Sequence, residues 1–349
     1  MSINDRYHRQ RIVDGIGKSG QEAIENSSVA IVGVGALGCM SASMLARAGV
    51  GRITLIDRDI VEGTNLQRQI LFDEEDATSH APKATAAARR VEAINSSIKI
   101  NAHVEDLTAL NVSRLLDDAD VIVDGLDNFQ TRYVLNDFAV QTKKPYMFAG
   151  VIAAEGNVMT ILPKDHRTPC LRCIFPDPPP VGSQETCDTV GVLAPAIGIA
   201  ASCQVVDVLK YLTGNIDKIS STLLTFDLWN TQSNRLSLGE PISNCPCCGE
   251  SNFEFLDATK GTDAAALCGR NAVQIRGHGE FDLDNIAIKL SAHGTFETSN
   301  GLVHGTLNEE QSADGTALEL RCFKDGRVIV HGTDDVGRAK AICARYVGN

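Results

Sequence analysis

The 349-residue sequence lacks several features that mark whole classes of protein. Its first six residues contain no apolar segment of the kind that a secretory signal peptide needs. No uninterrupted apolar run approaches the length of a membrane span, and no internal repeat or low-complexity tract stands out. We therefore expect a cytoplasmic protein with no membrane partner.

Clustered positive charge is also missing. The chain has 32 Lys and Arg residues against 44 Asp and Glu residues, which gives a formal net charge of −12. Nucleic-acid binding relies on clustered Lys and Arg side chains, so no nucleic-acid partner is expected. An acidic protein can still bind one nucleotide in a local site. The length suits one large α/β domain with a smaller one.

An alternation of apolar strands and helices predicts the fold class. Residues 29–38 form an apolar run that breaks into glycines, and a helical pattern follows to residue 48. Further elements are expected as strands at 52–57, 98–104, 120–125, 145–151 and 156–162, and as helices at 82–94, 109–117 and 128–142. This order favours an α/β fold with a Rossmann-like, mostly parallel sheet and helices on both faces.

The second half of the chain begins with an unusual segment. Residues 164–190 are rich in Pro and Cys, which predicts a long functional loop without regular structure. The elements expected after it are a helix at 194–212, strands at 223–229, 235–238, 318–323 and 327–330, and a final helix from about 333. We expect a first domain in 1–250, a linker in 251–263 and a small α+β domain in 264–349.

A glycine-rich turn predicts a nucleotide site. Gly33, Gly35 and Gly38 let the backbone approach a phosphate, and they precede a helix whose N–H groups favour negative charge. Asp57 lies 19 residues beyond Gly38, where a carboxylate accepts hydrogen bonds from ribose hydroxyls. The combination indicates a nucleotide but does not separate NAD from ATP. Glycines that serve only tight turns, with Asp57 as a cap, are the alternative.

The residues after Asp57 favour ATP. The segment 59–69 brings acidic, amide and guanidinium groups back toward the phosphates. Arg68 can bind phosphate oxygens with two N–H groups, Lys83 can add a second cation, and the carboxylate of Asp127 can hold Mg²⁺. Taken alone, each of these three residues is more simply interpreted as a charged side chain in solvent. At successive strand ends, however, they predict one crevice at the carboxyl edge of the sheet.

Four of the eleven cysteines predict a metal site. The pairs Cys170/Cys173 and Cys245/Cys248 have the spacing of tetrahedral zinc ligands, with a redox dithiol as the alternative. Cys247 competes with Cys248, and the spacing favours Cys248. A structural zinc contributes ~10–16 kcal/mol to folding, against a net stability of ~5–15 kcal/mol for a whole protein.

Together these residues resemble the ThiF/MoeB/HesA family, the bacterial relatives of ubiquitin-activating enzymes. The similarity runs from Arg6-Tyr7-His8-Arg9-Gln10 to Gly249. Six motifs follow in order: Gly-x-Gly-x-x-Gly, Asp-x-Asp, Asn-Leu-Gln-Arg-Gln, Asp-Asn and two Cys-x-x-Cys pairs. One departure is Ala36, where many members carry a third glycine.

The resemblance implies an adenylyltransferase that uses ATP and Mg²⁺. Its implied substrate is the C-terminal glycine carboxylate of a ubiquitin-like sulfur-carrier protein that serves thiamine or molybdopterin synthesis. Asp57 would bind the ribose, Asp127 would bind Mg²⁺, and Arg9 would reach the nucleotide of a neighbouring subunit in a homodimer. The other positions implied around ATP are Gly33, Gly35, Ala36, Gly38, Asp59, Asn65, Arg68, Gln69, Lys83 and Asn128.

Two features are less determined by the resemblance. Cys187 lies where the family places a thiol able to take part in acyl or sulfur transfer. The alternative is an exposed cysteine with no chemical role. A sulfurtransferase is a further candidate partner. Residues 264–349 carry no persulfide-type loop around a cysteine and do not end in Gly-Gly, so we expect a docking module for the carrier or another partner.

Three other functions are alternatives. An NAD-dependent oxidoreductase shares the glycine motif but explains neither the segment 65–69 nor the four paired cysteines. A non-catalytic scaffold would bind nucleotide or partner without chemistry. A related enzyme that activates a tRNA carboxylate is disfavoured by the acidic charge.

Overall fold

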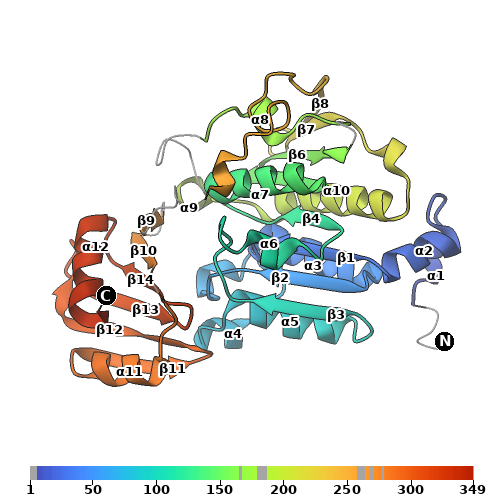
Figure 1. Ribbon diagram of the computed structural model, residues 1–349. Helices are drawn as coiled ribbons and strands as arrows, with labels where there is room; N and C mark the ends of the chain where they lie inside the picture. The colour runs from blue at the N-terminus through green and yellow to red at the C-terminus, as the bar shows by residue number, and fades with distance from the viewer. Residues whose placement is uncertain are drawn as a thin grey trace. The chain divides into compact units, whose positions relative to one another are not determined.

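The computed structural model describes residues 6–164, 167–178, 187–257, 264–267, 271–276 and 279–348. The chain divides into two compact units, each with its own sheet (Figure 1). The first unit comprises Met1–Pro180 and Val190–Thr259, and the second comprises Val181–Thr189 and Lys260–Asn349. The domain boundaries expected from the sequence stay a prediction.

The first unit is built on an eight-stranded sheet with the order β3-β2-β1-β4-β5-β6-β7-β8. Its strands are β1 (Ser28–Val32), β2 (Arg52–Ile56), β3 (Lys99–His103), β4 (Val121–Asp124), β5 (Tyr146–Ile152), β6 (Glu155–Ile161), β7 (Thr222–Asp227) and β8 (Gln232–Ser237). The strands β3, β2, β1, β4 and β5 pair in parallel, and β6, β7 and β8 continue the sheet in antiparallel pairs.

Helices cover both faces of this sheet. The helices of this unit are α1 (His8–Arg11), α2 (Gly17–Glu25), α3 (Ala36–Ala48), α4 (Glu74–Thr78), α5 (Lys83–Ile94), α6 (Val112–Leu116), α7 (Phe129–Thr142), α8 (Leu171–Ile174) and α10 (Ala194–Leu212), and the short helix α9 (Cys187–Val190) spans the boundary between the two units. Val29 and Ile31 of β1 point into a core with α3 and α5, whereas Ala30 and Val32 point into a core with α6 and α7. The predicted α/β fold is therefore confirmed.

Two expectations about the middle of the chain need correction. The segment 164–190 is not wholly irregular, because the short helices α8 and α9 lie in it. Of the helices that the structure describes, α10 alone is long and apolar enough to span a membrane, although no such stretch was expected. It packs against α3, β5 and β6, and Ala196, Ala200 and Ala201 on it are buried in a core cluster. These are the contacts of a core helix.

The second unit is a six-stranded antiparallel sheet with the order β11-β12-β13-β14-β10-β9. Its strands are β9 (Ala264–Leu267), β10 (Ala272–Arg276), β11 (Gly294–Ser299), β12 (Leu302–Gln311), β13 (Ala317–Phe323) and β14 (Arg327–His331). The helices α11 (Leu283–Ser291) and α12 (Val336–Ile342), with the π-helical turn η7 (Cys343–Val347), share one hydrophobic core with the sheet. The expected α+β class of this unit is confirmed.

Candidate functional site

The tight turn between β1 and α3 is the first part of the candidate site. Gly33 has a φ of 86°, and a Cβ there would lie 2.6 Å from the carbonyl oxygen of Gly125. A Cβ at Gly38 would lie 2.0 Å from the carbonyl oxygen of Gly33, so both glycines are needed for the backbone to pack. A Cβ at Gly35, in contrast, would come no closer than 3.8 Å to Gly125. Packing within the fold therefore does not require a glycine at position 35, which lies at the N-terminus of α3, where N–H groups can bind an anion.

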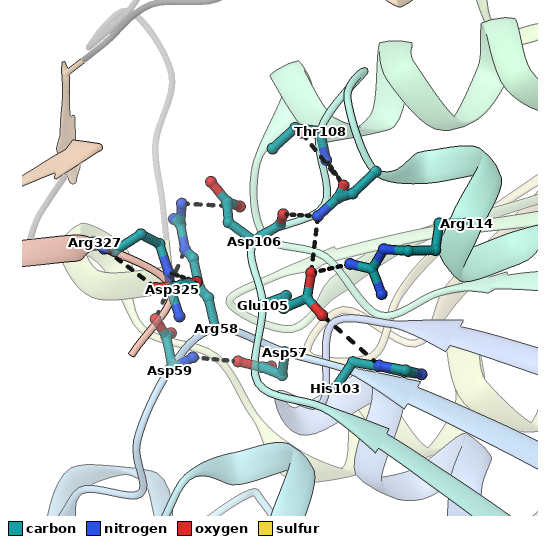
Figure 2. Close-up of polar contacts among 11 residues, drawn as sticks. Asp57, Arg58, Asp59, His103, Glu105, Asp106, Thr108, Arg114, Asp325 and Arg327 are labelled. Atoms are coloured by element: carbon teal, nitrogen blue, oxygen red, sulfur yellow. Dashed lines mark hydrogen bonds and ion pairs between the residues drawn. The ribbon is translucent and has the colours of Figure 1, made fainter. Parts of the chain in front are cut away.

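Asp57, Asp59 and Lys83 lie together beyond the carboxyl end of β2 (Figure 2 shows the two aspartates). The Asp57 carboxylate accepts hydrogen bonds from the backbone N–H groups of Val34 at 2.6 Å and Asp59 at 2.7 Å. The Nζ of Lys83, a residue only 4% exposed, lies 3.3 Å from Oδ2 of Asp59. Burial raises the pKa of Asp57 above its ordinary value; Lys83 opposes this shift and Asp59 adds to it. The β1 turn, the end of β2 and the start of α5 thus meet at one place.

The segment after Asp59 carries Asn65, Arg68 and Gln69. Asn65 is buried, and its Oδ1 accepts a hydrogen bond from the backbone N–H of Glu62 at 3.1 Å in the turn η2 (Gly63–Asn65). The buried Oε1 of Gln69 has no hydrogen-bond partner within the described chain. Because such an orphaned group costs about 1–3 kcal/mol, Gln69 is suited to a ligand. Arg68 donates to the Thr64 carbonyl at 2.9 Å, and no described contact joins it to Lys83.

Asp127 and Asn128 follow β4 in the turn that leads to α7. Asn128 caps this helix, because its Oδ1 accepts a hydrogen bond from the backbone N–H of Thr131 at 3.0 Å. Asp127 is exposed. The close contact between Gly125 and Gly33 brings this turn against the glycine-rich turn. The cofactor roles expected for Asp127 and Asn128 stay predictions.

Sequence reasoning missed a buried polar network below this turn. The Asp124 carboxylate accepts hydrogen bonds from Nε of Arg132 at 3.0 Å and from the Tyr146 hydroxyl at 2.7 Å. Gln204 on α10 donates to the backbone carbonyls of Asp124 and Met147 at 2.9 and 2.8 Å. The available signal was a carboxylate at the end of an apolar strand with an arginine eight residues later.

Arg9 is not part of this cluster. The side chain of Gln10, next to Arg9, donates to the Ala48 carbonyl at 2.9 Å, at the last turn of α3. Because α3 begins at the glycine-rich turn and its 13 residues rise about 20 Å, the exposed Arg9 lies at the opposite edge of the sheet. Cys187 begins α9 and is partly exposed, and its part in acyl or sulfur transfer stays a prediction.

Two Cys-x-x-Cys pairs meet in a second candidate site. The sulfur atoms of Cys170, Cys173, Cys245 and Cys248 all lie within 4.8 Å of one another, and three of the Sγ–Sγ distances are 3.9, 3.6 and 3.4 Å. Sulfur ligands around zinc, each about 2.3 Å from the metal, stand roughly 3.8 Å apart. Cys247 lies outside the group, and its Sγ accepts a hydrogen bond from Nδ2 of Asn136 at 3.3 Å. The four cysteines are therefore able to hold a metal such as zinc.

Comparison with known proteins agrees with this geometry. The ThiF family model matches residues 7–247. The sulfur carrier protein ThiS adenylyltransferase of Bacillus subtilis is 41% identical over 349 residues, which cover 99% of this chain and 100% of the relative. The sulfur carrier protein adenylyltransferase of Thermus thermophilus is 36% identical over 271 residues, which cover 76% of this chain and 96% of the relative. E. coli MccB in its crystal structure with ATP has the same fold, with a TM-score of 0.62 and 24% identity over 71% of this chain and 75% of that one.

Proposed function

The chain belongs to the ThiF family, and on that premise we propose that it is an enzyme that adenylates the C-terminal carboxylate of a ubiquitin-like sulfur-carrier protein with ATP. The observation that carries the proposal is the meeting of the glycine-rich turn, Asp57 and Lys83 at the carboxyl edge of the sheet. This arrangement occurs in a chain whose whole length matches a ThiS adenylyltransferase. That relative favours thiamine synthesis over molybdopterin synthesis as the pathway.

The reaction needs little chemistry from the protein. The carrier's carboxylate attacks the α-phosphorus of ATP, a new acyl–phosphate bond forms, and the bond to the leaving pyrophosphate breaks. The nucleophile is already ionised at neutral pH, so no side-chain base is required. Catalysis is therefore positioning and stabilisation of charge on the leaving group by Lys83 and Arg68. The other residues of the site bind the nucleotide. Asp57 holds the ribose, and Gln69 offers its unpartnered side-chain oxygen as a hydrogen-bond acceptor.

The proposed metals have separate places and separate roles. Mg²⁺ would be held by Asp127, and it would supply further neutralisation of phosphate charge when bound. Zinc would be held by the four clustered cysteines, which fill every position of a tetrahedral site. A closed site of this kind stabilises a fold and leaves no position for a substrate.

We also propose a cytoplasmic homodimer. Arg9 lies at the edge of the sheet opposite to its own glycine-rich turn, so it is placed to serve the nucleotide of a second copy. The apolar side chains of Ile12 and Val13, 67% and 51% exposed, follow it and are suited to such an interface. A sulfurtransferase that supplies sulfur after adenylation is a further partner, and Cys187 is the thiol proposed to receive the acyl group or the sulfur.

Residues 264–349 are proposed to dock the carrier or another partner. The full-length Bacillus subtilis relative extends over this region, whereas the Thermus thermophilus match covers only 76% of the chain. The carrier affinity of the whole chain should therefore exceed that of a chain that ends at Asp257. Equal affinities in titration calorimetry would exclude this docking role.

Exchange of labelled pyrophosphate into ATP tests the adenylation. The unaltered chain should exchange label only when a carrier with its C-terminal glycine is present. Arg68→Ala should abolish exchange because the leaving group loses a cation. Arg47→Ala, which removes an exposed arginine from the far end of α3, is the control and should leave the rate unchanged. No exchange by the unaltered chain would contradict the function, and normal exchange by Arg68→Ala would refute that residue's role.

A further inference from the structure

Arg132 is a buried cation that the proposed chemistry does not use. It lies near the start of α7 and is only 5% exposed. Its Nη2 donates to the Leu126 carbonyl at 2.8 Å and to the Ala149 carbonyl at 2.7 Å. Its Nε donates to Oδ2 of Asp124 at 3.0 Å. One guanidinium therefore joins three segments: the end of β4, the turn after it, and β5.

The turn between β4 and α7 is held from both sides by this ion pair. The backbone N–H of Leu126 donates to Oδ1 of Asp124 at 2.9 Å, while its carbonyl accepts from Arg132. Two residues further on, Asn128 is fixed as the cap of α7. Asp127 stands between these two residues in the chain, so the backbone on both sides of it is held in place.

The surroundings of Arg132 also restrict its own position. The guanidinium carbon lies 4.9 Å from the centroid of the Phe148 ring and 5.4 Å from that of Phe129. The Tyr146 hydroxyl donates to the same Asp124 oxygen as Nε of Arg132, at 2.7 Å. A buried ion pair rarely stabilises a fold more than apolar side chains of similar volume would. This pair instead fixes the positions of the oxygen atoms bonded to Arg132, because a guanidinium holds several acceptors in one plane.

We propose that Arg132 is a positioning residue for the divalent-cation site: its bonds to Asp124 and Leu126 set the turn that presents Asp127 to the Mg²⁺ of the nucleotide. This inference rests on the proposed function, in which Asp127 binds that cation. It assigns Arg132 an effect on cation affinity, and no contact with ATP or with the carrier.

Titration of Mg²⁺ against the chain with a non-hydrolysable ATP analogue tests the inference without turnover. Arg132→Lys keeps the charge, but a lysine ammonium lacks the planar fork with which the guanidinium holds the Asp124, Leu126 and Ala149 oxygens at the same time. Because loss of a residue that orients a metal ligand typically weakens metal affinity 10–100-fold, half-saturation by calorimetry should need at least about tenfold more Mg²⁺. The affinity for the analogue in EDTA should not change. Asp127→Asn should give the largest shift.

Two further variants make the test decisive. Tyr146→Phe removes one donor to Asp124 and keeps Arg132, so it should raise the Mg²⁺ concentration at half-saturation by less. If Arg132→Lys does not fold, Tyr146→Phe serves as the test variant in its place. Lys144→Met is the matched control, because Lys144 also donates to two carbonyls, those of Asp117 and Ala119 at 2.8 and 2.7 Å, at the other edge of the sheet. Its half-saturation should equal that of the unaltered chain.

The outcomes separate this inference from the function on which it rests. If the unaltered chain needs Mg²⁺ for tight binding but Arg132→Lys, or Tyr146→Phe in its place, has unaltered half-saturation, the positioning role is overturned and the adenylation stands. If the unaltered chain does not bind the analogue at all, the proposed function fails and the inference falls with it. A shift in Lys144→Met as large as that in Arg132→Lys would show a general loss of fold, and would also overturn the role.

Discussion

The three glycines of the motif meet different physical demands. At Gly33 and Gly38, a side chain would collide with backbone atoms at 2.6 and 2.0 Å, which no rotamer change can relieve. At Gly35, φ is −76° and the nearest atom would lie 3.8 Å from an added Cβ. The fold therefore tolerates alanine at Gly35, and the reason for a glycine there is the room it leaves beside the helix N-terminus.

This difference predicts opposite results for two substitutions. Gly35→Ala should unfold at nearly the same denaturant concentration as the unaltered chain but bind ATP at least about tenfold more weakly, because its methyl occupies space beside the phosphates. Gly38→Ala should lose about 1–3 kcal/mol or more of stability through overpacking. Urea unfolding and titration with ATP measure both quantities. Unchanged ATP affinity in Gly35→Ala would show that no phosphate lies at this turn.

Some site residues can be predicted from their spacing along the chain, whereas others come together only when distant elements pack. The cysteine pairs and the glycine-rich turn could be found because their spacing is itself the signal. The pair of Asp124 and Arg132 left only a weak local signal, a carboxylate at the end of an apolar strand with an arginine eight residues later, because its burial depends on β5, α7 and α10 packing together. The buried Oε1 of Gln69 is hidden in the same way.

Among the elements, burial also decided which strands were predictable. Every residue of β1 is buried, so its sequence is a continuous apolar run that stands out. The strand β11 has no buried residue and reads Gly-Thr-Phe-Glu-Thr-Ser, and most of the C-terminal half of β12 is polar and not buried. Those strands were missed because their pairing partners, more than their composition, put them in a sheet.

The cluster of four cysteines joins α8 to the segment around residues 245–248, so loss of a metal bound there should weaken the contact between these two elements. Cys248→Ser should lower bound zinc well below one ion per chain and lower the melting temperature by at least several degrees, since a structural zinc adds ~10–16 kcal/mol of binding to folding. Cys247→Ser is the matched control, because its sulfur lies outside the group and bonds to Asn136.

Elemental analysis and thermal unfolding of both variants check this prediction. Equal zinc loss in the two variants would place Cys247 among the ligands. A fully reduced, metal-free chain with an unchanged melting temperature would contradict a structural metal altogether.

At the scale of the whole molecule, the place of Arg9 predicts that the active unit contains two chains. Arg9→Ala and Arg68→Ala should each be inactive alone. In a two-fold dimer formed by random exchange of equal amounts, about a quarter of all sites would combine an intact Arg9 from one chain with an intact Arg68 from the other. Pyrophosphate exchange by the mixture should therefore return to about that fraction of the normal rate. A mixture that stays inactive after subunits have exchanged would place Arg9 in the site of its own chain.

The proposed function requires Asp57, Arg68, Lys83 and Asp127 to surround a single triphosphate at the carboxyl edge of the sheet. A crystal structure of the chain with a non-hydrolysable ATP analogue and Mg²⁺ tests it most directly. In this crystal structure the ribose should lie on Asp57, the phosphates at the start of α3 between Lys83 and Arg68, and the cation on Asp127. A nucleotide bound elsewhere, or one that these four side chains do not share, would contradict it.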